Sequence, residues 1–211
     1  HLNVNIKTAS LLKHKLMETL TEAESQRVLE GRIECDNASL GNASLRRKRH
    51  ESTSDKVPFI AAVQTDPGHH PKFVVLTPLK NLCRQEVASW AYKHVSKNAC
   101  VLTNNLDCFK AFDSSCEHKS FNVTASNEAF ITREFKWVNI VQANVKSAFT
   151  GALHCFKFKK YSARYLGNMQ FRFNHRFDLK GCFYKVLEES LRGSPMPAKV
   201  LFSPKWLILK E

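Results

Sequence analysis

Two apolar segments separated by a turn constrain the fold of this chain more than any other feature. Residues 57–65 (VPFIAAVQT) and 72–79 (KFVVLTPL) are rich in β-branched and aromatic residues, and DPGHHP, the segment between them, contains Pro and Gly. Such runs, bounded by turn residues, are typical of neighbouring antiparallel strands. A further strand around 32–36 precedes them, so the sequence predicts an antiparallel meander of three strands.

The segments that follow the meander alternate between helical and extended patterns. A helix predicted at 83–95 leads into an apolar run at 100–103 (CVLT). Because a helix between two strands is a crossover, the new strand should lie parallel to one strand of the meander. The other predicted elements are a short helix at 106–112, a strand at 119–123, and helices at 9–29, 135–153, 159–177 and 180–192.

This order of elements predicts an α/β protein with an RNase H-like (retroviral integrase-type) core. In such a core a mixed sheet of about five strands is flanked by helices, and here an N-terminal helical segment precedes it. We expect the helical segment to occupy residues 1–29, the core residues 30–192, and a proline-containing C-terminal extension residues 193–211.

A strong excess of positive charge indicates an acidic partner. The chain has 32 Lys and Arg residues against 19 Asp and Glu residues, a formal net charge of +13. Nucleic acid is the usual partner of such a chain, although a generically basic protein has the same balance of charge. Candidate DNA contacts lie on the first helix, in the polar loop RRKRH and on the helix at 159–177: Lys13, Lys15, Arg46, Arg47, Lys48, Arg49, Arg164, Arg172 and Arg176.

The cysteines and the apolar runs limit where such a protein works. Seven scattered cysteines form no C-x-x-C pair, which favours free thiols in a reducing compartment over a disulfide framework or a zinc finger. No apolar run approaches the roughly 18 to 20 residues that cross a bilayer. We therefore expect no membrane partner and a cytoplasmic location, associated with the nucleoid in a bacterium, or a nuclear location in a eukaryote.

An RNase H-like core brings acidic residues together from its first strand, its fourth strand and a late helix, where they hold two Mg²⁺ or Mn²⁺ ions. Asp36 occupies the first place, although a turn-forming Asp at a strand end is the simpler interpretation. The second place holds Asn104, which can equally end its strand in a turn. Asn144 and Lys146 lie on the late helix. The other acids near these places are Glu34, Asp107 and Asp113, and His118 is interpreted as a surface residue.

Six blocks, in order along the chain, match the pattern of one family. LEGRIECDNASLGN resembles a Leu-x-Gly-x-Val-Glu-x-Asp-Asp/Glu-x-Tyr-x-Gly-Gly block, and CVLTNNLDCFKAF resembles a Val-x-Ser/Thr-Asp-Gly-x-x-x-Phe block. KVPFIAAVQT, WVNIVQANVKSAFTGALHCF and KYSARYLGNMQFRFNHRFDL resemble the blocks between and after these, and HLNVNIKTASLLKHKLME resembles the end of a helix-turn-helix. Together they resemble the ISXO-like DDE transposases of bacterial insertion sequences, which are related to eukaryotic Merlin elements.

The resemblance implies a catalytic and metal-binding set. It places Asp36 on the first catalytic Asp, Asn104 on the second, and Asn144, followed by Lys146, on the third position. It further implies nicking and strand transfer of double-stranded DNA with Mg²⁺ or Mn²⁺, carried out by a homodimer or a larger assembly. The residues Arg172, Asn174 and Arg176 match an Arg-Phe-Asn-x-Arg block, which would contact the DNA backbone or serve packing.

The chain departs from the family pattern in its most characteristic places. Asn37, Asn104 and Asn168 each stand where the pattern has an acid, and Gly41-Asn42 replaces a Gly-Gly pair. We therefore expect a DDE transposase or its catalytically impaired descendant. The alternatives are a DNA-binding, non-catalytic protein, domesticated or decayed from a transposase, and a structural remnant without activity.

Overall fold

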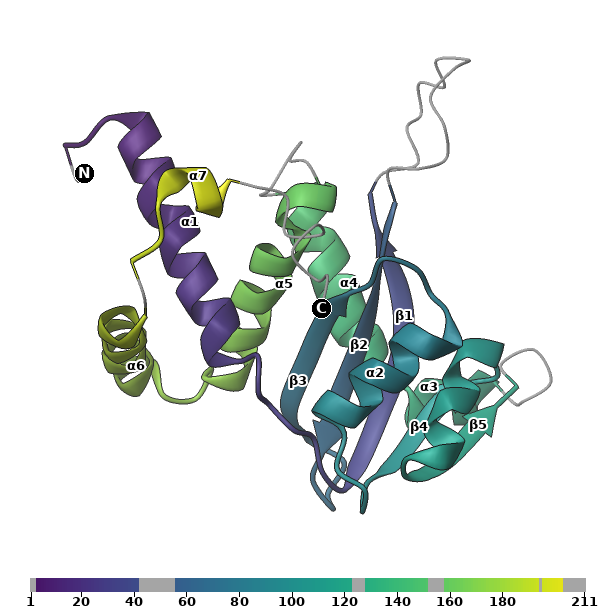
Figure 1. Ribbon diagram of the computed structural model, residues 1–211. Helices are drawn as coiled ribbons and strands as arrows, with labels where there is room; N and C mark the ends of the chain where they lie inside the picture. The colour runs from purple at the N-terminus through teal and green to yellow at the C-terminus, as the bar shows by residue number, and fades with distance from the viewer. Residues whose placement is uncertain (1–2, 42–55, 123–127, 152–157, 194, 203–211) are drawn as a thin grey trace, which may run out of the picture.

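The computed structural model describes residues 3–41, 56–122, 128–151, 158–193 and 195–202, and its centre is a five-stranded sheet with the order β3-β2-β1-β4-β5 (Figure 1). The strands are β1 (Arg32–Leu40), β2 (Val57–Thr65), β3 (Pro71–Pro78), β4 (Cys100–Asn104) and β5 (Glu117–Phe121). β1, β2 and β3 are antiparallel neighbours, whereas β4 is parallel to β1 and β5 is parallel to β4. The predicted meander, the parallel crossover and the RNase H-like class are confirmed.

β1 is longer than the strand predicted around 32–36. It continues through Asp36 to Leu40 and pairs residue for residue with β2, from Arg32 opposite Thr65 to Leu40 opposite Val57. The interpretation of Asp36 as a turn residue at a strand end is therefore wrong. The ladder to the apolar strand β2 holds the polar residues after Asp36 in an extended conformation, because tertiary pairing overrides their weak strand propensity.

Helices cover both faces of the sheet (Figure 1). The helix α2 and the 3₁₀ helix η1 pack on one face, α4 and α5 pack on the other, and α1 lies against α5. The described helices are α1 (Ile6–Ala23), α2 (Arg84–His94), η1 (Asp107–Ser114), α3 (Glu128–Glu134), α4 (Lys136–Thr150), α5 (Phe158–Asn174), α6 (Leu179–Arg192) and α7 (Ala198–Leu201).

The two faces of the sheet bury separate apolar clusters, because side chains alternate along each strand. On β1, Ile33 and Cys35 belong to the cluster on the α2 side, whereas Ala38 and Leu40 belong to the cluster on the α4 side. Glu34, and Asp36 with it, contact residues of α4. The alternation along β1 therefore turns both of these acids toward α4.

Several predicted boundaries shift in the structure. The helix predicted at 135–153 corresponds to α4, which begins at Lys136 and follows a separate short helix, α3. β5 begins at Glu117 and ends at Phe121, so it lies two residues earlier than the strand predicted at 119–123. The basic loop with Arg46, Arg47, Lys48 and Arg49 lies outside the described residues, as do residues 203–211 of the C-terminal extension.

Helix α5 packs closely on α1 at a glycine. A Cβ atom at Gly167 would lie 2.3 Å from Oγ1 of Thr21, so only glycine allows this approach of the two helices. Near this contact, Arg164 of α5 forms a buried ion pair with Glu18 of α1. Within the part of the chain that the structure describes, no helix is long and apolar enough to cross a membrane.

Candidate active site

Asp36 and Asn104 are neighbours across the pair of parallel strands β1 and β4. The ladder pairs Glu34 with Leu102, so the strands bring the residues two positions further along next to each other. Nδ2 of Asn104 donates a hydrogen bond of 2.7 Å to Oδ1 of Asp36. Oδ1 of Asn104 in turn accepts from the backbone N–H of Leu106 at 3.3 Å. Both ends of the Asn104 amide are therefore engaged, and its N–H side faces the carboxylate.

Two further amide groups complete the contacts of the Asp36 carboxylate. The backbone N–H of Asn37 donates to Oδ1 at 2.8 Å, and Nε2 of Gln142 on α4 donates to Oδ2 at 3.3 Å. Burial raises the pKa of Asp36, while the hydrogen bonds from Asn37 and Gln142 and the charge of Lys146 lower it, and the balance is a raised pKa. Amide N–H groups therefore donate hydrogen bonds to both carboxylate oxygens of Asp36.

The residue of α4 that reaches the site is Gln142 rather than Asn144. Asn144 is exposed, whereas Gln142 is buried on the face of α4 that also buries Val138, Val141 and Val145. Gln142 is therefore a site residue that was not predicted from the sequence. Its signal was helical spacing: it lies four residues after Val138 and four before Lys146, and residues four apart share a helix face.

The side chains at the site do not fit two divalent metal ions. Mg²⁺ and Mn²⁺ bind through oxygen atoms, usually with several carboxylates. Here one carboxylate faces two side-chain amides that present N–H groups to it. In the described segments, no three His, Cys, Asp or Glu residues are grouped so that they could hold a metal ion.

The other nearby acids are engaged elsewhere. Both oxygens of buried Glu34 are used, because one accepts from the backbone N–H groups of Trp137 and Val138 at the start of α4 and the other accepts from Arg32. Asp107 is exposed and paired with Arg84 and Lys110. Neither acid supplies the carboxylate that Asn104 lacks.

A chain of hydrogen bonds fixes β4 directly before Asn104. Oγ1 of buried Thr103 lies 2.7 Å from Nε2 of His118, and Nδ1 of His118 lies 2.5 Å from Oδ1 of Asp113. The side chain of His118 is only 4% exposed, so its interpretation as a surface residue is wrong. Because Thr103 has no exposed surface, this chain holds the strand end in place and offers no nucleophile to a substrate.

The candidate DNA contacts differ in their exposure. Lys13 and Lys15 on α1 and Arg172 on α5 are exposed. Arg164 is buried, with its guanidinium bonded to Glu18 and to the carbonyl of Leu201, so it is not available to a DNA backbone in this fold.

The Arg-Phe-Asn-x-Arg block joins α5 to the edge of the sheet. Asn174 accepts from the backbone N–H of Val74 at 2.8 Å and donates to the carbonyl of the same residue at 3.0 Å. Arg176 donates to the carbonyls of Pro71 and Lys72. β3 is the edge strand of the sheet, and these side chains satisfy backbone groups that would otherwise be open to another strand. Asn174 and Arg176 therefore make packing contacts in this fold.

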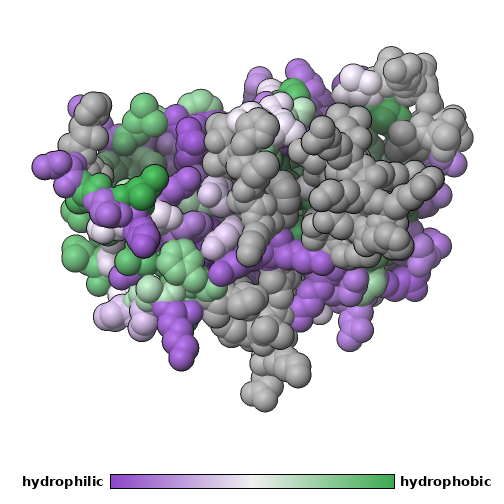
Figure 2. Space-filling model, turned by 90° about the horizontal axis from the view of Figure 1, so that it is seen from above, coloured by the Kyte–Doolittle hydropathy of each residue, from purple (hydrophilic) through white to green (hydrophobic). Residues whose placement is uncertain are grey.

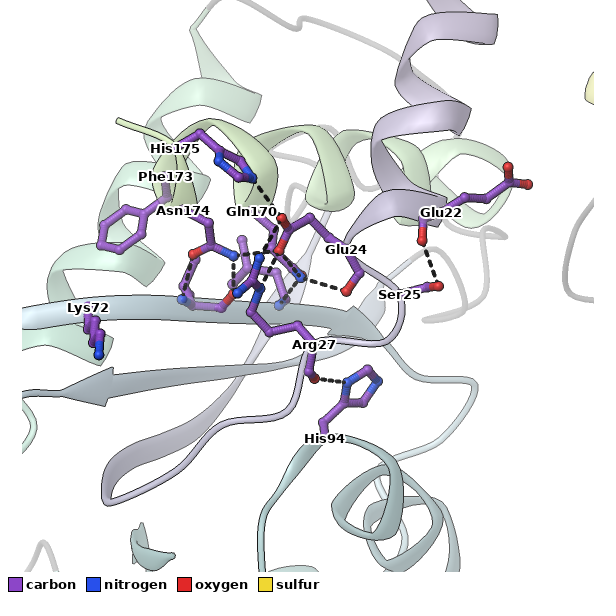
Figure 3. Close-up of polar contacts among 12 residues, drawn as sticks. Glu22, Glu24, Ser25, Arg27, Lys72, His94, Gln170, Phe173, Asn174 and His175 are labelled. Carbon is purple, nitrogen blue, oxygen red and sulfur yellow. Dashed lines mark hydrogen bonds and ion pairs between the residues drawn. The ribbon is translucent and has the colours of Figure 1, made fainter. Parts of the chain in front are cut away.

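Glu24, just after α1, is the centre of the same polar network (Figure 3). Its buried carboxylate is paired with Arg27 at 2.7 Å and with His175 at 3.0 Å, and accepts from Asn174 at 2.8 Å. Burial raises the pKa of Glu24, but the hydrogen bonds from Arg27, Asn174 and His175 and the charge of Arg27 outweigh burial and lower the pKa to about 2. The network ties the end of α1 to α5 and β3.

The fold and the site together define a protein class. A mixed sheet in the order β3-β2-β1-β4-β5, with Asp36 on its first strand, the end of β4 beside it and α4 packed on β1 and β2, has the arrangement of an RNase H-like DDE domain. Comparison with protein families matches the ISXO2-like transposase domain over residues 28–174, and the chain belongs to this family of mobile-element transposases. Transposases of this family typically use divalent metal ions and bind DNA. No curated protein matches the chain.

Proposed function

We propose that this chain is a DNA-binding domain of transposase origin in which metal-dependent cleavage and strand transfer are impaired. The observation that carries the proposal is the hydrogen bond of 2.7 Å from the Asn104 amide to the Asp36 carboxylate. A carboxylate at position 104 would repel Asp36 at this distance unless a cation lay between them. The amide removes that repulsion and satisfies the carboxylate without a cation.

The charge around Asp36 also disfavours a two-metal site. Cleavage in this class depends on metal ions that stabilise both the attacking and the leaving oxygen. Asp36 is one carboxylate with a raised pKa, and Lys146 adds a positive charge close to it. Gln142 contributes an amide where the geometry has room for a carboxylate. This donor set binds divalent ions weakly, so no metal-dependent step is assigned to these residues.

The surface charge supports retained DNA binding. The chain has a net charge of +13, and Lys13, Lys15 and Arg172 are exposed on α1 and α5. Cationic side chains neutralise phosphates and release counterions without any need for catalysis. DNA binding therefore does not depend on metal-binding carboxylates at the site.

Restoring the acids tests this proposal. Mn²⁺ should raise the melting temperature of the variant Asn104→Asp/Gln142→Glu, because this variant places two more carboxylates beside Asp36 and these can bind the ion. The variant should also nick supercoiled plasmid DNA in Mn²⁺. The wild-type chain should show neither effect. The matched control is Asn104→Asp/Asn144→Glu, whose new glutamate lies on the exposed side of α4 and should not restore the response.

Two results would contradict the proposal. Mn²⁺-dependent nicking by the wild-type chain, absent in Asp36→Ala, would show that the site still works with its amides. Phosphate contacts are strongest at low salt, so failure of the wild-type chain to bind a duplex of about 30 base pairs under these conditions would contradict the proposal that it binds DNA.

A further inference from the structure

Helix α6 (Leu179–Arg192) exposes an apolar stripe. Leu179, Phe183, Leu187 and Leu191 recur every four residues, and each is between 49% and 79% exposed. Tyr184, 69% exposed, lies beside the stripe with its ring centroid 5.8 Å from that of Phe183. The structure describes no buried residue in this helix. A single exposed leucine needs no explanation, but a contiguous stripe of this kind marks an interaction surface.

The opposite side of α6 is already occupied. α6 lies beside α1, outside the layer of helices on the sheet (Figure 1), and its half-buried residues include Cys182 and Val186. Seen from above, apolar residues gather on the side of the molecule where α1, α6 and α7 lie, whereas polar residues predominate around the sheet (Figure 2). The stripe therefore faces away from the body of the protein.

We propose that this stripe is a self-association surface, on which two copies of the chain pack their α6 helices antiparallel about a two-fold axis. The spacing of the stripe is the first reason. Centred on position 185, an antiparallel pair places Leu179 against Leu191 of the second copy and Phe183 against Leu187. Every large side chain of the stripe then meets another, as the isologous interface of a two-fold dimer requires.

Charge is the second reason for a second copy in this orientation. Lys180 and Glu188 lie on the same flank of the stripe, near opposite ends of the helix. In the antiparallel pair, Lys180 of each copy approaches Glu188 of the other, which also forms an ion pair of 2.6 Å with Arg192 of its own helix. The two Tyr184 rings meet between these pairs. A parallel pair would instead bring Lys180 against Lys180 and Glu188 against Glu188.

The area fits a dimer of modest stability. An exposed aromatic side chain presents up to about 200 Å² and a leucine somewhat less, so the five side chains offer roughly 600 Å² per copy. An interface of standard size buries about 800 Å² per partner, so the stripe and its flanking charges approach this range. We expect dissociation at roughly micromolar concentration.

Sedimentation over a range of concentrations, without DNA, tests the proposal on the full chain. The wild-type chain should change from monomer to dimer as its concentration rises. Phe183→Ser or Leu187→Ser should raise the dissociation constant of the dimer at least about tenfold, because each copy then buries less apolar area in the interface. Tyr92→Ser is the matched control, since Tyr92 is an 88% exposed aromatic residue on α2 and far from the stripe in sequence. Measured at a concentration where the chain is monomeric, the melting temperature of each variant should match that of wild type, because none of these side chains is buried within one copy.

Charge reversal tests the antiparallel orientation. Lys180→Glu alone and Glu188→Lys alone should each weaken the dimer, since each puts like charges against one another, and the double variant should restore it. A chain that stays monomeric at every concentration, or a dimer that Leu187→Ser leaves unchanged, would overturn the proposed surface. A double variant no tighter than the single variants would overturn the antiparallel arrangement.

Discussion

At the scale of single residues, the state of the site depends on which atoms the side chains present to Asp36. Aspartate and asparagine have nearly the same shape, and the Asn104 amide lies where a carboxylate would lie. The amide donates where a carboxylate would accept, and Gln142 repeats this from α4. The two amides thus form a satisfied hydrogen-bond network with Asp36, where carboxylates of the same shape would repel it.

A change of charge at buried Glu24 should lower the stability of the fold. The pKa of Glu24 is lowered from about 4.5 to about 2, so its charged form stabilises the folded state by about 3 kcal/mol at neutral pH. This contribution is present above pH 4.5 and is lost as pH falls toward 2. We expect Glu24→Gln to lower the free energy of unfolding at pH 7, and the difference from wild type to shrink below pH 4.5.

Denaturant unfolding of both proteins at several pH values measures this difference. The matched control is Glu22→Gln, two residues earlier, because Glu22 is exposed and its side chain points away from the network (Figure 3). A difference between wild type and Glu24→Gln that does not change with pH would contradict the electrostatic origin of the effect.

At the scale of elements, α5 connects the N-terminal helix to the sheet. It packs on α1 through Gly167 and the Glu18–Arg164 ion pair, and it caps the edge strand β3 through Asn174. The polar residues of α5 therefore have different tasks, which depend on the side of the helix on which they lie.

Two arginines of α5 should separate these tasks. Arg164→Met removes the buried ion pair between Arg164 and Glu18, and breaking such a pair costs about 3 to 5 kcal/mol. Arg172→Met removes an exposed charge, so it should weaken DNA binding and leave the melting temperature within about 1 °C of wild type. Thermal unfolding and a DNA-binding titration, run on both variants, measure the two effects. A large loss of stability in Arg172→Met, or none in Arg164→Met, would contradict the assignment.

At the scale of the whole molecule, the net charge of +13 is the main source of attraction to DNA. With four phosphates neutralised, affinity should fall about a hundredfold between roughly 50 and 200 mM salt, because released counterions drive the binding. Fluorescence anisotropy of a labelled duplex over this range measures the slope. Binding that is insensitive to salt would point to apolar contacts in place of the exposed cationic side chains.

The order of elements was predictable because it depends on local patterns. The two apolar runs around DPGHHP specified β2 and β3, and the crossover helix before CVLT specified a parallel β4. The boundaries were less predictable. β1 extends to Leu40 only because β2 pairs with its polar half, and no local preference of residues 36–39 reports that pairing.

The sequence by itself determined that this chain folds as a mixed-sheet transposase domain and that Asp36 and Asn104 lie at corresponding strand positions. These properties follow from hydrophobic periodicity and residue identity, which are written along the chain. The tertiary structure alone decided that Gln142, and not Asn144, faces Asp36, and that Arg164 is buried while Arg172 is exposed. The reason is that the face a helical residue presents depends on how the helix is rotated against its neighbours. On α4, Gln142 is buried and Asn144, two residues further on, is exposed to water. On α5, Arg164 is buried and Arg172, eight residues further on, is exposed.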